Sequence, residues 1–211
     1  MSNGPTLIYH ITHKDNLEGI ISRGGLVAQS VMDTDPIAYC NIAHATIQDR
    51  RAQTQVSCGP GGFLHDYVPF YFAPRSPMLY AIDRGNVEDC TEDQSDIVYL
   101  LSSAQGVADS GLEFVFTDGH GIMELSDFYD DLEDLDEIDW DVMNARYWAD
   151  TDDDPDRKRR RQAEFLVYKM VPWDRIEMIA VINNAAKTQV EGIISNSTPK
   201  HPIKVKPDWY Y

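Results

Sequence analysis

The stretch RRRQAEFLVYKM (residues 159–170) sets a carboxylate, Glu164, at the start of an apolar run that predicts a buried strand. Other short apolar runs predict strands at residues 7–11, 67–73, 97–101, 112–116, 176–182 and 203–206. Capping residues and spacing predict helices at residues 15–21, 41–52 and 184–195, and a short one that starts at Ser76 and Pro77. Strands with interspersed helices and no regular βαβ alternation predict an α+β domain whose sheet is split or mixed.

The composition predicts one compact domain over residues 1–211. Of these residues 43% are hydrophobic, enough for a sizeable core, and no Pro/Gly/Ser-rich linker divides them. No apolar run approaches the roughly 20 residues of a membrane span, and the first residues lack a basic-then-apolar secretion signal, so a cytoplasmic protein without membrane contact is expected. Cys40, Cys58 and Cys90 are few and widely spaced, which predicts reduced thiols rather than disulfides or a zinc site.

The negative charge is concentrated in one segment. Of the formal net charge of −17, the residues from Asp118 to Asp156 carry −15, from 16 acids and one arginine. This segment is expected to be a solvated loop or helix face. Five cations, Arg157 to Arg161, follow it directly, and they either bind phosphates or neutralise the neighbouring acids. Nucleic-acid binding is therefore not excluded by the overall charge.

Gln162 and Glu164 form the first candidate site. They lie two apart at a strand start, so both side chains face the same side. A carboxylate beside a sugar ring can stabilise the positive charge that develops in glycosidic cleavage. The alternative is a strand-end glutamate that pairs with a neighbouring arginine.

Other polar and aromatic residues could also face a cleft. His13 follows a strand and His120 lies between two glycines after another, where each ring can reach a ligand or can belong to a core edge or a turn. Arg51 closes a helix, where it can act in a site or simply interact with the helix dipole. The strand at 67–73 is rich in aromatic residues, and Pro69 predicts that it is an edge strand or carries a bulge.

Six stretches that span nearly the whole chain carry a family resemblance. They are YHITHKDNLEGIISRGGL (9–26), IQDRRAQTQV (47–56), LHDYVPFYFAPRSPML (64–79), FTDGH (116–120), EIDWDVMNARYWAD (137–150) and RRQAEFLVY (160–168). In this order they resemble the DarT family of bacterial DNA ADP-ribosyltransferase toxins. The resemblance implies an ADP-ribosyltransferase-like split β-sheet core with flanking helices and a cleft that binds NAD.

The resemblance also implies a reaction. Members of the family transfer ADP-ribose from NAD to a base in single-stranded DNA, thymine in the branch that this chain is most similar to, and release nicotinamide. The family's catalytic glutamate falls on Glu164 and its catalytic arginine on Arg51. Three alternatives stay open: transfer to guanine, transfer to RNA or protein, and a non-catalytic module that binds NAD or nucleic acid.

Binding residues and partners follow from the same resemblance. The residues similar to NAD-binding positions are His13, Asn16, Leu26, Tyr71 and Met78. The residues expected on the DNA side are His120, Arg75, Arg146 and Arg160. NAD brings its own leaving group, so no metal is required. The expected partners are single-stranded DNA and a macrodomain antitoxin that removes the modification, and the chain is expected to be a monomer.

Overall fold

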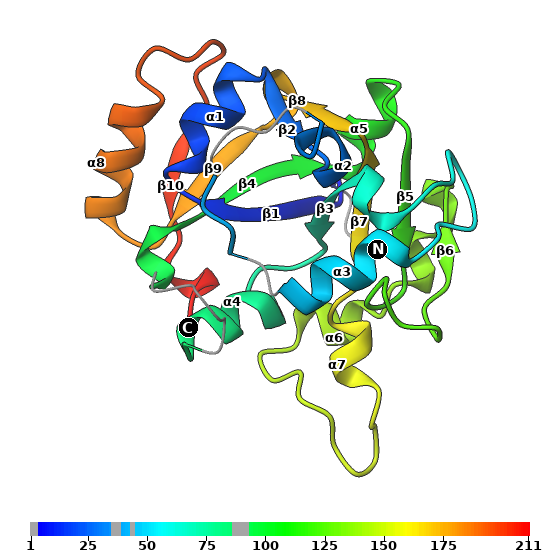
Figure 1. Cartoon of the computed structure of the whole chain (residues 1–211). Coiled ribbons are helices and arrows are strands. Elements are labelled where there is room, and N and C mark those ends of the chain that lie inside the picture. The colour runs from blue at the N-terminus through cyan, green and yellow to red at the C-terminus, as the bar shows by residue number, and fades with distance from the viewer. Residues whose placement is uncertain (1–3, 35–38, 43–44, 86–92) are drawn as a thin grey trace.

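The computed structural model describes residues 4–34, 39–42, 45–85 and 93–211, and Figure 1 shows their arrangement. The strands are β1 (Leu7–His13), β2 (Gly25–Val27), β3 (Tyr67–Tyr71), β4 (Ile97–Ser103), β5 (Phe114–Thr117), β6 (Phe128–Tyr129), β7 (Glu164–Tyr168), β8 (Met170–Pro172), β9 (Met178–Val181) and β10 (Ile203–Val205). The α-helices are α1 (Asn16–Ser22), α2 (Gln29–Met32), α3 (Ala45–Gln53), α4 (Pro77–Asp83), α5 (Ala104–Asp109), α6 (Trp140–Asn144), α7 (Arg157–Arg160) and α8 (Asn184–Ile193). Short 3₁₀ turns lie at Leu64–Asp66, Gln94–Asp96, Leu132–Glu137, Trp173–Arg175 and Pro207–Trp209.

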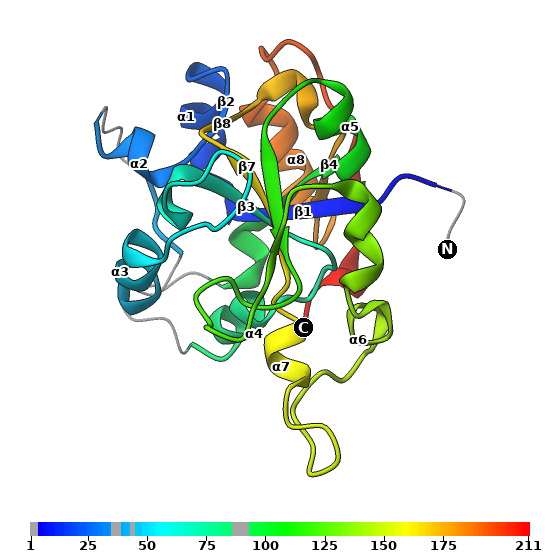
Figure 2. The same ribbon diagram turned by 90° about the vertical axis from the view of Figure 1, so that its right-hand side faces the viewer.

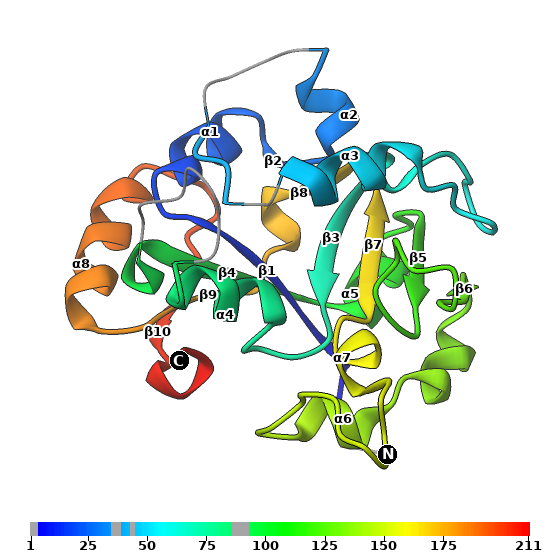
Figure 3. The same ribbon diagram turned by 60° about the horizontal axis from the view of Figure 1, so that its bottom comes forward.

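The main sheet is split in its middle. Within the described residues its strand order is β10-β9-β4-β1-β3-β7-β5-β6, with β10 parallel to β9 and the other neighbours antiparallel. Strands β1 and β4 pair along seven positions, whereas β1 and β3 pair only at Tyr9 and Tyr71. In Figure 3, β1 runs obliquely to β3 and β7, which lie side by side. The predicted α+β class with a split sheet is confirmed.

Pro69 marks the line of the split. The prediction of an edge strand or a bulge is wrong, because β3 lies between β1 and β7 and its register with β7 is unbroken from Tyr67 to Tyr71. A proline cannot donate a ladder hydrogen bond, and this is tolerated here because the pairing between β1 and β3 does not extend to Pro69. Its carbonyl instead accepts a hydrogen bond from the ring of His10, Nδ1 to O 2.8 Å.

Helices lie on both sides of the sheet. Figure 2 shows α2 and α3 on one side, α5 on the other, and α6 and α7 at the lower end, where the chain between α6 and α7 projects from the molecule. Every residue of β4 is buried, and β4 shares the largest apolar cluster with β7 and α8. The same cluster contains Phe70 at the end of β3, Phe72 just after it and Phe165 at the start of β7, so the packed core holds both strand ends. None of the described helices is long and apolar enough to cross a lipid bilayer.

Most predicted elements are present with shifted ends. The apolar run 165–170 is two strands rather than one, because Lys169 has a φ of 60° and interrupts the extended backbone. Two short elements, β2 and α2, were not predicted, and residues 35–38 beyond them lie outside the described part. The helix predicted at 41–52 is present as α3 (Ala45–Gln53), and residues 43–44 lie outside the described part.

Candidate active site

A cavity of about 420 Å³ lies where the two halves of the sheet diverge. Its walls come from β1, α1, β2, α3, β3 and α4, and Glu164 at the start of β7 contributes to it. Its volume is within the range of small-molecule sites. The predicted site residues that line it are Asn16, Leu26, Arg51, Tyr71, Met78, His120 and Glu164.

Glu164 is the most heavily coordinated carboxylate of this cavity. One oxygen, Oε2, accepts a hydrogen bond from Arg51 Nη1 at 2.6 Å. The other, Oε1, accepts from the Gly121 amide at 3.1 Å and lies 3.2 Å from His120 Nδ1. The expected alternative, a pair with an adjacent arginine of 159–161, is wrong, because the partner comes from α3. Only 3% of Glu164 is exposed.

These contacts keep Glu164 ionised. Burial by itself raises the pKa of the carboxyl group, because the charged form loses water. The charge of Arg51 and the hydrogen bonds from His120 and Arg51 outweigh burial and lower the pKa to about 2. The site therefore offers a fixed negative charge in a buried setting, which suits the stabilisation of a developing positive charge.

Arg51 is held by α3 and is itself almost fully buried, with 7% of the residue exposed. Its Nη1 donates to Glu164, but its Nη2 has no hydrogen-bond partner among the described residues. A buried guanidinium with a free N–H group is an incomplete polar site. It could hold an anionic oxygen or a carbonyl oxygen of a bound molecule.

The remaining predicted wall residues come from four elements: Asn16 from α1, Leu26 from β2, Tyr71 from β3 and Met78 from α4. Asn16 on α1 fixes the segment at residue 40, because its amide exchanges two hydrogen bonds with the Cys40 backbone, at 2.7 and 2.9 Å. Tyr71 at the end of β3 faces Glu164 across the strand pair. Burial and the charge of Glu164 raise the pKa of the Tyr71 hydroxyl, which therefore stays protonated.

His13 does not line the cavity as the structure describes it. Its ring is buried at the end of β1, and Nδ1 accepts a hydrogen bond from the Asp15 amide at 3.2 Å. This contact fixes the turn that leads into α1, which carries Asn16. His13 thus lies behind the wall, and its predicted contact with NAD stays a prediction.

The predicted DNA-side arginines lie outside the cavity lining. The guanidinium of Arg75 stacks over the ring of Tyr211 at 4.5 Å, and its backbone has the left-handed φ of 58°. Arg146 is exposed and lies 5.8 Å from the ring of Tyr147. Their roles in DNA binding stay predictions.

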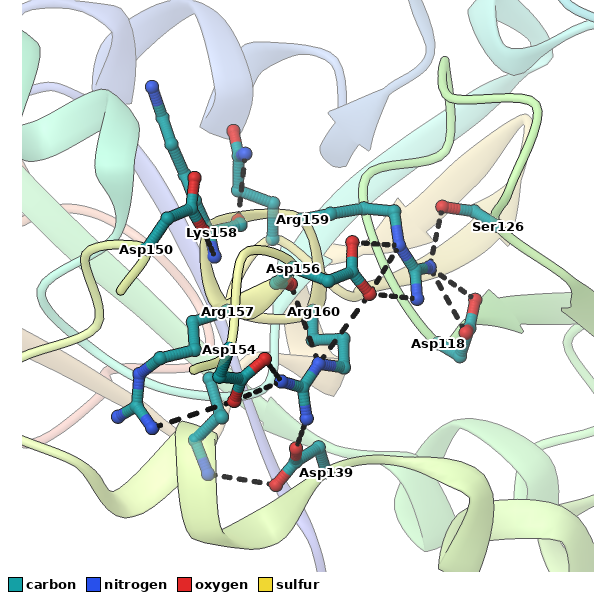
Figure 4. A network of polar contacts seen from close by, with 12 residues as sticks. Asp118, Ser126, Asp139, Asp150, Asp154, Asp156, Arg157, Lys158, Arg159 and Arg160 are labelled. Atoms are coloured by element: carbon teal, nitrogen blue, oxygen red, sulfur yellow. Dashed lines mark hydrogen bonds and ion pairs between the residues drawn. The ribbon is translucent and has the colours of Figure 1, made fainter. Parts of the chain in front are cut away.

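Arg160 is surrounded by carboxylates. It forms ion pairs with Asp139, Asp154 and Asp156 (Figure 4). Of the two interpretations of the basic run, neutralisation of the acids is therefore the one that holds for Arg160. Arg159 is held in the same way by Asp118 and Asp156. A phosphate would have to compete with these carboxylates for both guanidinium groups.

Lys158 differs from its neighbours on α7. Its side chain points away from the aspartates in Figure 4, and it lines the cavity. Its ammonium group has no hydrogen bond or ion pair with any residue that the structure describes, whereas its backbone amide donates to Asp150. Gln162, in the turn between α7 and β7, lines the same cavity, so Gln162 and Glu164 do face one space as expected.

Two histidines of the lining were not predicted. His10 on β1 donates to Pro69, and burial lowers its pKa to about 4, so its ring is neutral. His65 lies 3.0 Å from Gln48 Oε1, and burial together with the charge of Arg51 lowers its pKa. The sequence does contain a signal for His65, since it lies two residues before the aromatic strand in the stretch LHDYVPF.

A family model described as "ssDNA thymidine ADP-ribosyltransferase, DarT" matches residues 9–211. The chain belongs to the DarT family. A DNA ADP-ribosyl transferase of Thermus aquaticus is 46% identical over 209 residues, which are 98% of this chain and 90% of that protein. One of Escherichia coli O127:H6 is 33% identical over 205 residues, 97% of this chain and 93% of its own length.

Solved DarT structures share the fold. Thermus sp. 2.9 DarT in complex with ADP-ribosylated ssDNA superimposes with a TM-score of 0.92 at 46% identity, covering 98% of this chain and 97% of that one. Its complex with NAD+ gives a TM-score of 0.89 at 43% identity over the full length of both chains. The DarT family and the enzyme class expected from the sequence are confirmed.

Proposed function

We propose that this chain transfers ADP-ribose from NAD to a thymine base in single-stranded DNA. The observation that carries the proposal is the buried, ionised Glu164, held by Arg51, His120 and Gly121 at the wall of the cavity. Membership of the DarT family supports the acceptor, and the similarity to Thermus sp. 2.9 DarT solved with NAD+ supports the donor.

The polar and apolar groups that line the cavity suit the binding of NAD. NAD supplies the ADP-ribosyl group and a neutral leaving group, nicotinamide. The unpartnered Nη2 of Arg51 is a donor for one of its oxygens, and Tyr71 and Met78 add an aromatic and a flexible apolar surface beside it. Asn16 on α1 and Leu26 on β2 also line the cavity.

Glu164 supplies the electrostatic contribution. Positive charge develops on the ribose when its bond to nicotinamide breaks, and a carboxylate with a pKa of about 2 remains negative throughout the physiological range. It is already oriented by three contacts, so little reorganisation of the carboxylate accompanies cleavage of the bond to nicotinamide.

The proton of the acceptor base needs a separate explanation. Thymine N3 must lose its proton, and a carboxylate with a pKa of about 2 accepts protons poorly. Glu164 becomes a better base when the Arg51 contact is lost, because burial then raises its pKa. We therefore propose that the guanidinium group of Arg51 leaves Glu164 and turns toward the bound substrates before the proton is removed.

Lys158 is our candidate for the phosphate contact on the DNA side. It lines the cavity with an ammonium group that no described residue pairs, whereas Arg160 is occupied by three aspartates. A flexible lysine at the mouth of a cavity binds phosphate as a point charge. His120, which contacts Glu164, lines the same cavity.

The test is a direct product assay. The protein is incubated with NAD and with short single-stranded oligonucleotides of differing thymine content, and mass spectrometry looks for the gain of one ADP-ribose unit on thymine. Glu164→Gln, which keeps the shape and loses the charge, should lose the product while staying folded. Product on guanine, RNA or protein, or NAD binding without nicotinamide release in every reaction, would overturn the proposal.

A modified chromosome harms its own cell, so we further propose that the enzyme acts in the cytoplasm as a toxin with a macrodomain antitoxin as its partner. Membership of the DarT family supports this context. The test is growth of cells that express the chain with and without a DNA-ADP-ribose hydrolase of the macrodomain class. Equal growth in both cases, with modified DNA present, contradicts the pairing.

A further inference from the structure

The segment from Asp118 to Asp127, called here the His120 loop, carries two of the groups that contact Glu164. His120 Nδ1 lies 3.2 Å from Glu164 Oε1, and the Gly121 amide donates to the same oxygen. Both groups sit on irregular backbone rather than on a strand or helix. The loop is closed on itself by bonds between Asp118 and Asp127, and Arg50 Nη2 donates to the Ile122 carbonyl at 3.0 Å.

Arg159 is in contact with this loop at several points. Its carbonyl accepts the His120 amide at 3.0 Å. Its Nη1 donates to both carboxylate oxygens of Asp118, at 3.0 and 3.1 Å, and to Ser126 Oγ at 3.1 Å. Ser126 Oγ in turn donates to the His120 carbonyl at 2.9 Å. The Arg159 side chain thus links Asp118 near the beginning of the loop to Ser126 near its end, and the Arg159 carbonyl holds His120.

The opposite edge of the guanidinium is fixed as well. Asp156 accepts from Nε and Nη2 of Arg159 at 2.8 to 3.0 Å. The side chain is only 12% exposed, and its guanidinium packs against Gly119 so closely that a methyl group there would clash with it. A planar fork with five donors can make this set of contacts, whereas an ammonium group cannot.

We infer that Arg159 is a positioning residue of the active site, which acts through the His120 loop and sets the contacts of His120 and Gly121 with Glu164. This inference rests on the proposed function for its effect on catalysis. Its structural content, the placement of the Gly121 amide, does not depend on which molecule is modified. Arg159 itself does not line the cavity as described.

The experiment compares Arg159→Gln with Arg157→Gln, which makes the same charge change on the same helix at a residue that has no hydrogen bond or ion pair to the described loop. We expect Arg159→Gln to reduce the hydrogen-exchange protection of the Gly121 amide, while Arg157→Gln leaves it as in the wild type. In the product assay Arg159→Gln should lower kcat about tenfold or more, because a misplacement of about 1 Å can cost a hundredfold in rate. The KM for NAD should change by about twofold or less, since no cavity wall is removed.

Two further variants guard against an effect of unfolding. Ser126→Ala removes only the hydroxyl that links Arg159 to the His120 carbonyl and should give a smaller change in the same direction. Arg159→Lys keeps the charge without the fork and should recover only part of kcat. Unchanged Gly121 protection in both Arg159→Gln and Ser126→Ala would overturn the inference. A wild type that modifies no oligonucleotide overturns the proposed function instead, and Gly121 protection still tests the loop.

Discussion

Arg51 Nη1 lies 2.6 Å from Glu164 Oε2, although 113 residues separate the two along the chain. Both side chains are nearly inaccessible to solvent. A buried pair of this kind contributes little net stability compared with apolar residues, but breaking it leaves one charge without a partner. The pair therefore couples the stability of the fold to the electrostatics of the site.

Replacement of Arg51 by methionine should destabilise the protein by about 3 kcal/mol or more, because Glu164 is then buried without its counter-charge. The double variant with Glu164→Leu should recover much of that loss, since no buried charge remains. Urea unfolding of the two single variants, the double variant and the wild type measures the coupling. Additive losses in the double variant would show that the pair is not energetically coupled.

The contribution of Glu164 to stability should depend on pH. Its pKa in the folded protein is about 2, below the ordinary value of 4.5, so its contribution is complete above the unfolded pKa and is lost as the pH falls toward 2. The difference in Tm between the wild type and Glu164→Gln should therefore shrink between about pH 6 and about pH 3. A difference that stays constant over this range would contradict the lowered pKa.

Arg161 should be a structural residue rather than a substrate contact. Its guanidinium is buried and donates to the carbonyls of Val142 at 2.8 Å, of Pro74 at 2.7 Å and of Met143. Arg161→Ala leaves these acceptors unsatisfied and should cost about 3 kcal/mol in the free energy of unfolding. Arg157→Ala, at an ion pair of 3.8 Å, should cost about 0.5 kcal/mol or less. Equal losses in the two variants would argue against the role of Arg161.

Lys158→Gln should weaken the binding of single-stranded oligonucleotides and make it less sensitive to salt. Loss of one phosphate contact lowers the slope of log K against log salt by about 0.7 for a single strand. Lys187→Gln, at an exposed i,i+4 pair on α8, is the matched control and should leave the slope unchanged. An unchanged slope for Lys158→Gln would leave the cavity without its proposed phosphate contact.

Local patterns predicted the fold better than the site. Apolar runs and caps located most strands and helices, because burial and capping act within a few residues. Strands β2 and β8 were missed because each is three residues long and pairs with a segment far away, which leaves no period in the sequence. The place of β3 beside β1 was missed for a related reason, since Pro69 indicates an edge unless the split of the sheet is known.

The site depended on tertiary contacts that no spacing contains. Glu164 alone predicted a salt bridge to a neighbouring arginine, and the true partner comes from α3. The basic run was compatible with phosphate binding and with neutralisation of the acids. The sequence alone could not decide, because Arg159 pairs both with Asp156, three residues away, and with Asp118, 41 residues away. Only the resemblance to a family brought Arg51 and Glu164 together before the structure did.

The acids around α7 have a consequence for how this part of the chain folds. A helix of four consecutive cations is too short to form in isolation, and its charges repel one another. Asp118, Asp139, Asp154 and Asp156 act as built-in counterions that remove this repulsion. The acidic segment thus allows a basic helix to be ordered beside Glu164. Replacement of these aspartates by neutral residues is expected to disorder α7 rather than to strengthen DNA binding.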